Sequence, residues 1–273
     1  MIMNNVFDIK RFGRYLAYDL NNARNTFGVS ALTIGLLPLI VLFFNTLFGL
    51  VFTGSVPEVA APVKMMILVF AFIIVAISGP VKLYGHLTER RSGSDWLMIP
   101  ASSFEKFLSM AIMLCIVLPI VVLGLFSICD LLLSWIVPVY GDSVVRQIGG
   151  GLSQFLTNGN DLGIVFLTPG GTIAGTWMSW CMCVLPFALG AIIFNKGKAA
   201  KTILCLIGLN MLLSLIAAIV FKSFDFSNFE TFLENLTAER ASFWVNFLVN
   251  AIYLIVVGGL LTALYFRVRT IKH

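Results

Sequence analysis

Side chains able to do chemistry are few in this chain and do not form a recognisable site. The 273 residues include two histidines, His86 and His273, and no H-E-x-x-H metal motif. No G-x-x-x-x-G-K-[ST] loop is present to hold nucleotide phosphates. We therefore expect no catalytic residue, no metal ligand and no cofactor, and we do not expect the chain itself to hydrolyse ATP as a P-loop enzyme.

The cysteines favour packing over redox chemistry. All five lie inside or at the end of apolar runs, none forms a C-x-x-C pair, and none is near a histidine. Free cysteine in such surroundings behaves as a small apolar side chain. We interpret these residues as packing residues: Cys115, Cys129, Cys181, Cys183 and Cys205.

The composition places the chain in a membrane. Hydrophobic residues make up 59% of it and charged residues 11%, which leaves too little polar surface to cover a soluble fold. A helix needs about 20 apolar residues to cross the hydrocarbon core. We predict an all-α polytopic membrane protein with six transmembrane helices, at residues 28–52, 65–81, 107–129, 172–194, 203–221 and 243–266. The third run stays apolar nearly to Val139, so we expect Asp130 to mark its outer boundary and to snorkel there.

The distribution of lysine and arginine predicts that both termini are cytosolic. Of the 18 basic residues, only four fall on the opposite side: Lys64, Arg146, Lys222 and Arg240. This asymmetry is typical of the positive-inside rule. The net charge of +5 therefore reflects membrane topology, and we expect no nucleic-acid partner.

The N-terminal residues 6–20 predict an amphipathic helix that lies along the inner leaflet and contacts membrane lipid. Its apolar stripe repeats at helical spacing, and basic side chains occupy the other face. The alternative is a polar leader before the first span. The stripe contains Ile9, Phe12, Leu16 and Leu20, and the basic residues are Lys10, Arg11 and Arg14.

A second short helix is predicted on the outer side, before the last span. Ser227 and Glu230 have the spacing of a capping box, in which each side chain accepts a hydrogen bond from the other residue's backbone N–H. The apolar residues that follow at helical spacing would face the membrane edge or the bundle: Phe229, Phe232, Leu233 and Leu236.

The longest interruption on the predicted cytosolic side, residues 82–106, has the pattern of a binding segment. Four charged residues keep it out of the hydrocarbon, and an apolar run follows them. Such a run is rarely exposed without a protein or lipid to cover it. Pro100 ends this run, and Ser102 with Glu105 forms a predicted capping box at the start of the third span. The charged residues are Glu89, Arg90, Arg91 and Asp95, and the apolar run is Trp96, Leu97, Met98 and Ile99.

The six predicted spans contain no lysine, arginine, aspartate or glutamate. Ion-coupled carriers commonly need ionisable groups near mid-bilayer. If the bundle transports a substrate, the sequence therefore favours an energy source outside the membrane.

Together these features resemble the permease subunits of type-two ATP-binding-cassette (ABC) exporters. The run from Arg91 to Leu108 also resembles the "LPAS…EKF" signature of small ABC permease-like membrane proteins from Bacteroidetes, with Ile99 in place of leucine. The resemblance in topology covers the whole chain, and the signature covers less than a tenth of it.

The resemblance implies that the segment at 82–106 docks onto a separate P-loop ATPase subunit in a bacterial cytoplasmic membrane. Trp96, Leu97 and Met98 would be its apolar anchors, with Glu89, Arg90, Arg91 and Asp95 as rim charges. It also implies a second permease subunit, identical or different. The alternatives are a segment that only packs beneath its own bundle, a stand-alone secondary carrier, and a non-transporting scaffold or immunity-type protein.

Overall fold

The computed structural model describes residues 7–52, 54–56, 58–88, 93, 96, 98–146, 173–223 and 238–270, and these residues form helices and connecting turns without a strand. The prediction of an all-α, multi-pass membrane protein is confirmed at this level, because five helical stretches among them are long and apolar enough to cross a membrane. These are Ile9–Phe52, Pro62–Thr88, Ser103–Ile136, Lys198–Ile219 and Val249–Thr270. The orientation of the termini stays a prediction.

The chain divides into two compact units. Unit 1 contains Met1–Leu83 and Leu97–Asn160, and unit 2 contains Tyr84–Trp96 and Asp161–His273. The helices of unit 1 are α1 (Ile9–Gly35), α2 (Leu37–Phe52), α3 (Ala61–Tyr84, whose last residue belongs to unit 2), α5 (Ser103–Ile112), the π-helix η2 (Met113–Val117), α6 (Leu118–Ile136) and the short 3₁₀-helix η3 (Pro138–Tyr140).

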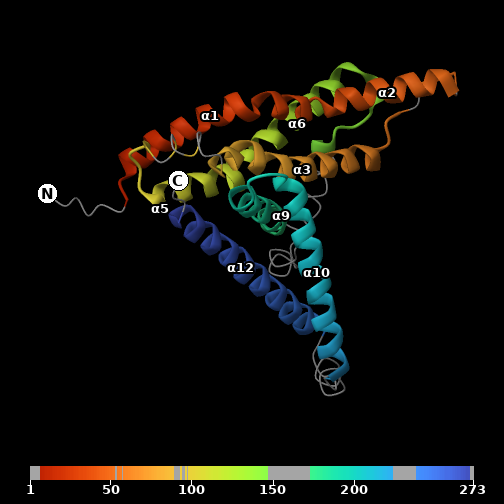
Figure 1. Ribbon diagram of the computed structural model, residues 1–273. Coiled ribbons are helices and arrows are strands. Elements are labelled where there is room, and N and C mark those ends of the chain that lie inside the picture. The colour runs from red at the N-terminus through yellow and green to blue at the C-terminus, as the bar shows by residue number, and fades with distance from the viewer. Residues whose placement is uncertain are drawn as a thin grey trace. The chain divides into compact units, whose positions relative to one another are not determined.

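Unit 1 is organised around the contact between α1 and the continuous helix formed by α5, η2 and α6. Figure 1 shows α1 and α2 running along this helix, and both contact α6. A close crossing lies at Gly35, where an added Cβ would come within 2.6 Å of the Leu125 Cβ. The glycine therefore allows the two helices to approach, and Ile34, Val122 and Phe126 are buried.

The N-terminal helix is longer than the sequence predicts. Asp8 caps it by accepting a hydrogen bond from the Lys10 backbone N–H at 2.9 Å, and α1 then continues without interruption to Gly35. The predicted division into an interfacial helix at 6–20 and a span from 28 is therefore wrong. The break comes at Leu36, just before Pro38, which lacks the N–H that a continuing helix would need.

The third span also differs from its predicted end. A π-helix at Met113–Val117 precedes Pro119, the kind of local widening that accommodates a missing backbone donor. Beyond it, α6 continues past the expected end at Cys129 as far as Ile136. The prediction that Asp130 snorkels is wrong, because its side chain is fully buried inside unit 1.

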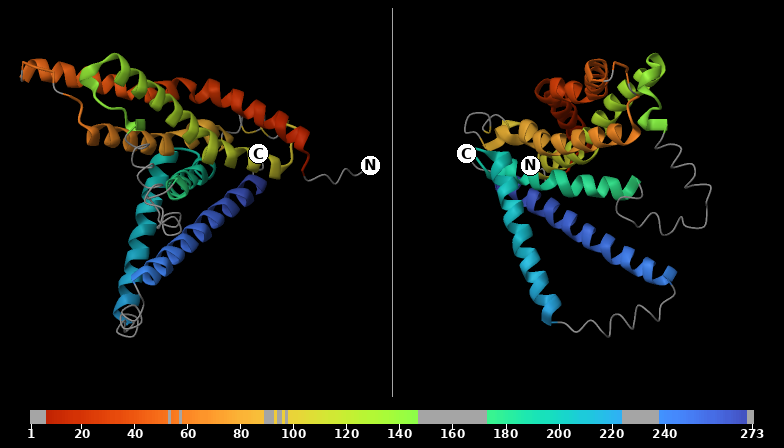
Figure 2. Two further views of the ribbon diagram at one scale, coloured as in Figure 1. Left: turned by 180° about the vertical axis from the view of Figure 1, so that it is seen from behind. Right: turned by 90° about the vertical axis from the view of Figure 1, so that its right-hand side faces the viewer.

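Unit 2 is organised around α9 (Ile173–Ile193), which contacts α10 (Lys198–Ser223), α12 (Ala238–Thr270) and the short 3₁₀-helix η1 (Gly85–Thr88). The turn into α10 uses Gly197 at φ +64°, a conformation that favours glycine. Both α10 and α12 are long single helices (Figure 2). Helix α9 coincides with the predicted span 172–194, but its apolar stretch at Trp177–Ile193 is shorter than the other five, so the count of six spans stays a prediction.

Candidate functional site

The predicted binding segment at 82–106 changes unit twice. The chain passes from unit 1 to unit 2 between Leu83 and Tyr84 and returns between Trp96 and Leu97. Inside unit 2, η1 contacts α9, and the Lys198 ammonium group donates a hydrogen bond to the Gly85 carbonyl. The segment is therefore anchored within unit 2 while both of its ends are covalently joined to unit 1.

The apolar anchors expected in this segment differ in exposure. The Trp96 side chain is only 7% exposed, whereas Met98 is 80% exposed. The expectation that Trp96 stands at the surface beside Met98 is therefore wrong for this conformation, and its physical reason is that a large aromatic side chain gains most by burial. Five other predicted interface residues lie outside the described residues: Glu89, Arg90, Arg91, Asp95 and Leu97.

The predicted capping box at the start of α5 is confirmed. The Ser102 hydroxyl accepts from the Glu105 backbone N–H at 3.2 Å, and the Glu105 carboxylate accepts from the Ser102 backbone N–H at 2.9 Å. Proline and glycine are absent from the ten residues of α5, so the cap leads directly into the third span.

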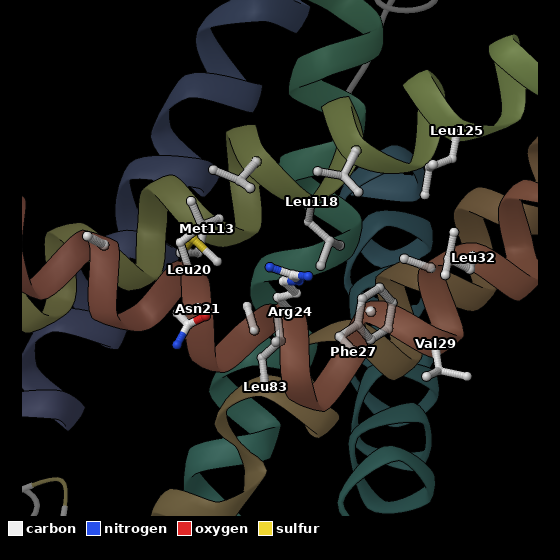
Figure 3. Close-up of a pocket in the computed structure, with 16 residues that line it drawn as sticks. Leu20, Asn21, Arg24, Phe27, Val29, Leu32, Leu83, Met113, Leu118 and Leu125 are labelled. Carbon is white, nitrogen blue, oxygen red and sulfur yellow. The ribbon is translucent and has the colours of Figure 1, made fainter.

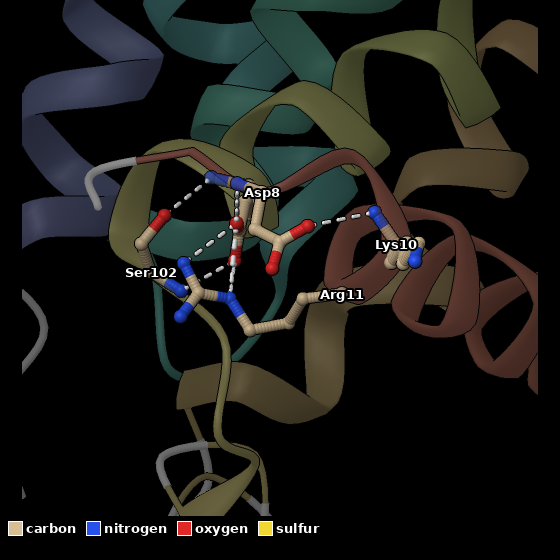
Figure 4. A network of polar contacts seen from close by, with 5 residues as sticks. Asp8, Lys10, Arg11 and Ser102 are labelled. Carbon is tan, nitrogen blue, oxygen red and sulfur yellow. Dashed lines mark hydrogen bonds and ion pairs between the residues drawn. The ribbon is translucent and has the colours of Figure 1, made fainter. Parts of the chain in front are cut away.

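The same carboxylate holds the beginning of α1, which the sequence did not indicate. Glu105 accepts from the Asp8 backbone N–H at 2.9 Å and from two nitrogens of the Arg11 guanidinium at 2.8 Å (Figure 4). Glu105 is fully buried, and the Arg11 side chain is 36% exposed. Such a two-point contact fixes orientation as well as distance. We call the set Asp8, Arg11, Ser102 and Glu105 the inner clamp.

A second contact lies two turns further along α1. The Ser109 hydroxyl donates to the Asp19 carboxylate at 2.8 Å, and both side chains are buried. The face of α1 that packs against the protein therefore carries Tyr15 and Asp19. Two residues of the predicted apolar stripe, Ile9 at 74% and Leu20 at 49%, are exposed and free to contact lipid, whereas Phe12 and Leu16 are half-buried beside the packed face.

A cluster of buried polar groups lies at the opposite end of the third span. The Asp130 carboxylate accepts from the Tyr140 hydroxyl at 2.6 Å and from the Val144 backbone N–H at 2.7 Å. The Lys64 ammonium group donates to the carbonyls of Tyr140 and Asp142 and lies 4.0 Å from the centre of the Tyr140 ring. We call the set Lys64, Asp130 and Tyr140 the outer cluster.

The outer cluster fixes the segment that follows α6. Burial, then the hydrogen bond to Asp130, raises the pKa of the Tyr140 phenol above its ordinary value, so the phenol remains a donor at neutral pH. The turn closes at Gly141, where φ is +73° and an added Cβ would lie 2.1 Å from a carboxylate oxygen of Glu58. Both the backbone conformation and the space therefore require glycine.

For several residues with a predicted role, the structure does not test that role. The outer-helix residues lie outside the described part of the chain: Phe229, Phe232, Leu233 and Leu236. Lys10 and Arg14 of the N-terminal helix are exposed, and Phe12 and Leu16 are half-buried. No group of three or more histidine, cysteine, aspartate or glutamate residues within the described ranges could hold a metal ion.

Comparison with known proteins does not assign the chain to a family, because no protein-family model, curated protein or solved structure matches it.

Proposed function

We propose that this chain is the membrane-spanning permease subunit of an ATP-driven ABC exporter and that it receives the motion of a separate ATPase through residues 82–106. The observation that carries the proposal is the double crossing of this segment between the two units. A partner protein that displaces this segment would act on both units at once, because the segment belongs to unit 2 and is covalently joined to unit 1 at both ends.

The inner clamp supports this role because it gives the motion a path into the membrane. Met98 is exposed, and the capping box begins four residues after it. Glu105 connects that box to Asp8 and Arg11 at the beginning of α1. A displacement of the segment would therefore move the first and third spans together instead of only bending a loop.

The exposed apolar helices of unit 2 support a second permease subunit. Only 6% of the apolar window of α10 is buried, compared with 44% in the helix formed by α5, η2 and α6. Lipid covers part of such a surface, and a second membrane subunit would cover more of it. A homodimer and a heterodimer both fit this observation.

A stand-alone carrier is the second candidate, and the outer cluster is the observation that favours it. The six predicted spans contain no charged residue, which disfavours an ion-coupled carrier. In the structure, however, two ionisable residues, Lys64 and Asp130, are buried within α3 and α6. Buried ionisable residues of this kind mark proton or ion pathways in many transporters.

The test is to co-express the tagged chain with the P-loop ATPase encoded nearest to its gene and to reconstitute the purified pair in liposomes. We expect co-purification and ATP-dependent export. Met98→Glu should weaken co-purification at least about tenfold, because it puts a charge into an apolar contact. Lys196→Glu, another exposed residue on the predicted cytosolic side, is the control and should leave co-purification unchanged.

Transport by the chain alone under an ion gradient, without ATP, would instead establish the carrier. Equal retention of the ATPase by Met98→Glu and wild type would exclude residues 82–106 as the docking segment.

A further inference from the structure

A pocket of about 660 Å³ lies within unit 1, between α1, the end of α3 and the third span. Its size falls in the range of roughly 300–1,000 Å³ that is usual for small-molecule sites. Figure 3 shows Phe27 and Leu32 of α1 on one side and Met113, Leu118 and Leu125 on the other. The lining is apolar except for two side chains of α1, Asn21 and Arg24.

Arg24 gives the pocket an uncompensated positive charge. Its guanidinium group extends toward Leu118 in Figure 3. None of the lining residues is an aspartate or glutamate. Among the residues that the structure describes, neither Arg24 nor Asn21 has a side-chain hydrogen bond or ion pair. Both side chains are exposed at the edge of this apolar lining, so the guanidinium group can bind an anion supplied from outside the chain.

The pocket includes residues near the predicted cytosolic ends of the second and third spans. Arg24 lies in the middle of α1, Leu83 follows the second predicted span, and Met113 lies in the second turn of the third predicted span. From Met113 the apolar lining continues to Leu125, about 18 Å along a helix at 1.5 Å per residue. The site thus pairs a cation with an apolar path along the third span.

The π-helix shapes this path. Met113 and Val117 are the first and last residues of η2, and both line the pocket. A π-helix widens the backbone and displaces side chains from their α-helical positions, and such bulges often occur at functional sites. The local irregularity of the third span is therefore located in the wall of the pocket.

We propose that this pocket binds one anionic glycerophospholipid from the cytosolic leaflet. The phosphate would accept hydrogen bonds from Arg24 and Asn21, and one acyl chain would lie along η2 and the beginning of α6. Basic pockets between spans on the cytosolic side are suited to anionic headgroups. A soluble anion would not use the apolar length, and a neutral lipid would leave the guanidinium without a counter-charge.

The test uses the full chain, purified in detergent, stripped of lipid and titrated with phosphatidylglycerol or with phosphatidylcholine of the same acyl chains. Native mass spectrometry counts the bound lipids. We expect one tight phosphatidylglycerol, bound at least about tenfold more strongly than phosphatidylcholine. Arg24→Gln should remove this preference, and Arg24→Lys should retain most of it. Arg14→Gln removes another exposed positive charge of the same helix, one that does not line the pocket, and should have no effect on this preference.

The acyl half of the site has its own pair of variants. Val121→Trp fills the pocket and should weaken both lipids. Ile128→Trp adds the same ring two turns along α6, outside the pocket, and should weaken neither. Each variant is first checked for an unchanged far-UV circular dichroism spectrum and a single gel-filtration peak.

Three results would overturn the site: equal affinity for the two lipids, equal losses in Arg24→Gln and Arg14→Gln, or displacement of phosphatidylglycerol by an equal concentration of inorganic phosphate. None of these measurements involves an ATPase or transport. The lipid site can therefore fail while the proposed permease function stands, and the reverse also holds.

Discussion

Replacing Asp130 tests whether the outer cluster stabilises unit 1. The carboxylate accepts from two buried donors, the Tyr140 hydroxyl at 2.6 Å and the Val144 N–H at 2.7 Å. Asp130→Ala leaves both donors without this acceptor. Asp130→Asn keeps one acceptor, because the amide oxygen can bind Val144 N–H while the Tyr140 hydroxyl rotates to accept from the amide nitrogen.

The size of the effect follows from counting these donors. Leaving a buried donor unsatisfied costs about 1–3 kcal/mol, and Asp130→Ala leaves two such donors. We expect the free energy of unfolding to fall by about 3 kcal/mol, near the lower end of the range for two donors, because water can reach a helix end. Asp130→Asn should cost about 1 kcal/mol. Asp130→Ala and Tyr140→Phe remove the same hydrogen bond, so their effects should be non-additive by about 1 kcal/mol.

The assay is unfolding of the purified chain in mixed micelles with increasing sodium dodecyl sulfate, followed by circular dichroism. Asp142→Asn is the matched control. Its carboxylate is 66% exposed and pairs with Arg146 at 3.3 Å, and such a surface pair contributes little. The outer cluster does not stabilise unit 1 if the unfolding free energy of Asp130→Ala is within about 0.5 kcal/mol of the wild-type value, or if Asp142→Asn lowers it as much as Asp130→Ala does.

Two further predictions concern each unit separately. The raised pKa of Tyr140 means that its contribution to stability is complete below the unfolded pKa, near 10, and is lost as pH rises above it. The melting temperature should therefore fall between about pH 9 and about pH 11, and it should fall less in Tyr140→Phe than in wild type. In unit 2, Gly190→Ala should lower the melting temperature by several degrees, because the new Cβ would lie 1.8 Å from the Thr202 hydroxyl oxygen and overpack the contact between α9 and α10. Gly208→Ala is the control: it meets no atom within 4 Å and should be neutral or stabilising by about 0.5–1 kcal/mol.

The features predicted correctly from the sequence are local ones. Long apolar runs predict helices because the membrane interior leaves few other structures possible. The capping box of Ser102 and Glu105 depends on a spacing of three residues, so the pattern alone predicts it.

The errors come from residues whose partners are distant in sequence. The predicted gap between residues 20 and 28 is absent, because α1 passes through Asn21, Asn22 and Asn25 and asparagine disfavours a helix only weakly. Arg11 is 94 residues from Glu105, and no local pattern connects them. Asp130 follows an apolar run and therefore suggests a boundary, but the donors on Tyr140 and Val144 make its burial possible.

The two buried acids of the third span suggest how it could respond to force. Glu105 fixes its beginning to α1, and Asp130 fixes its far end to the segment around Tyr140. Between them lies η2, where the backbone already departs from α-helical bonding and which lines the proposed lipid site. A helix held at both ends bends where its hydrogen bonding is weakest. We therefore expect motion entering at residues 82–106 to change the shape of the lipid pocket, and the coupling must be reciprocal: a lipid that favours one shape of η2 also biases the position of the segment.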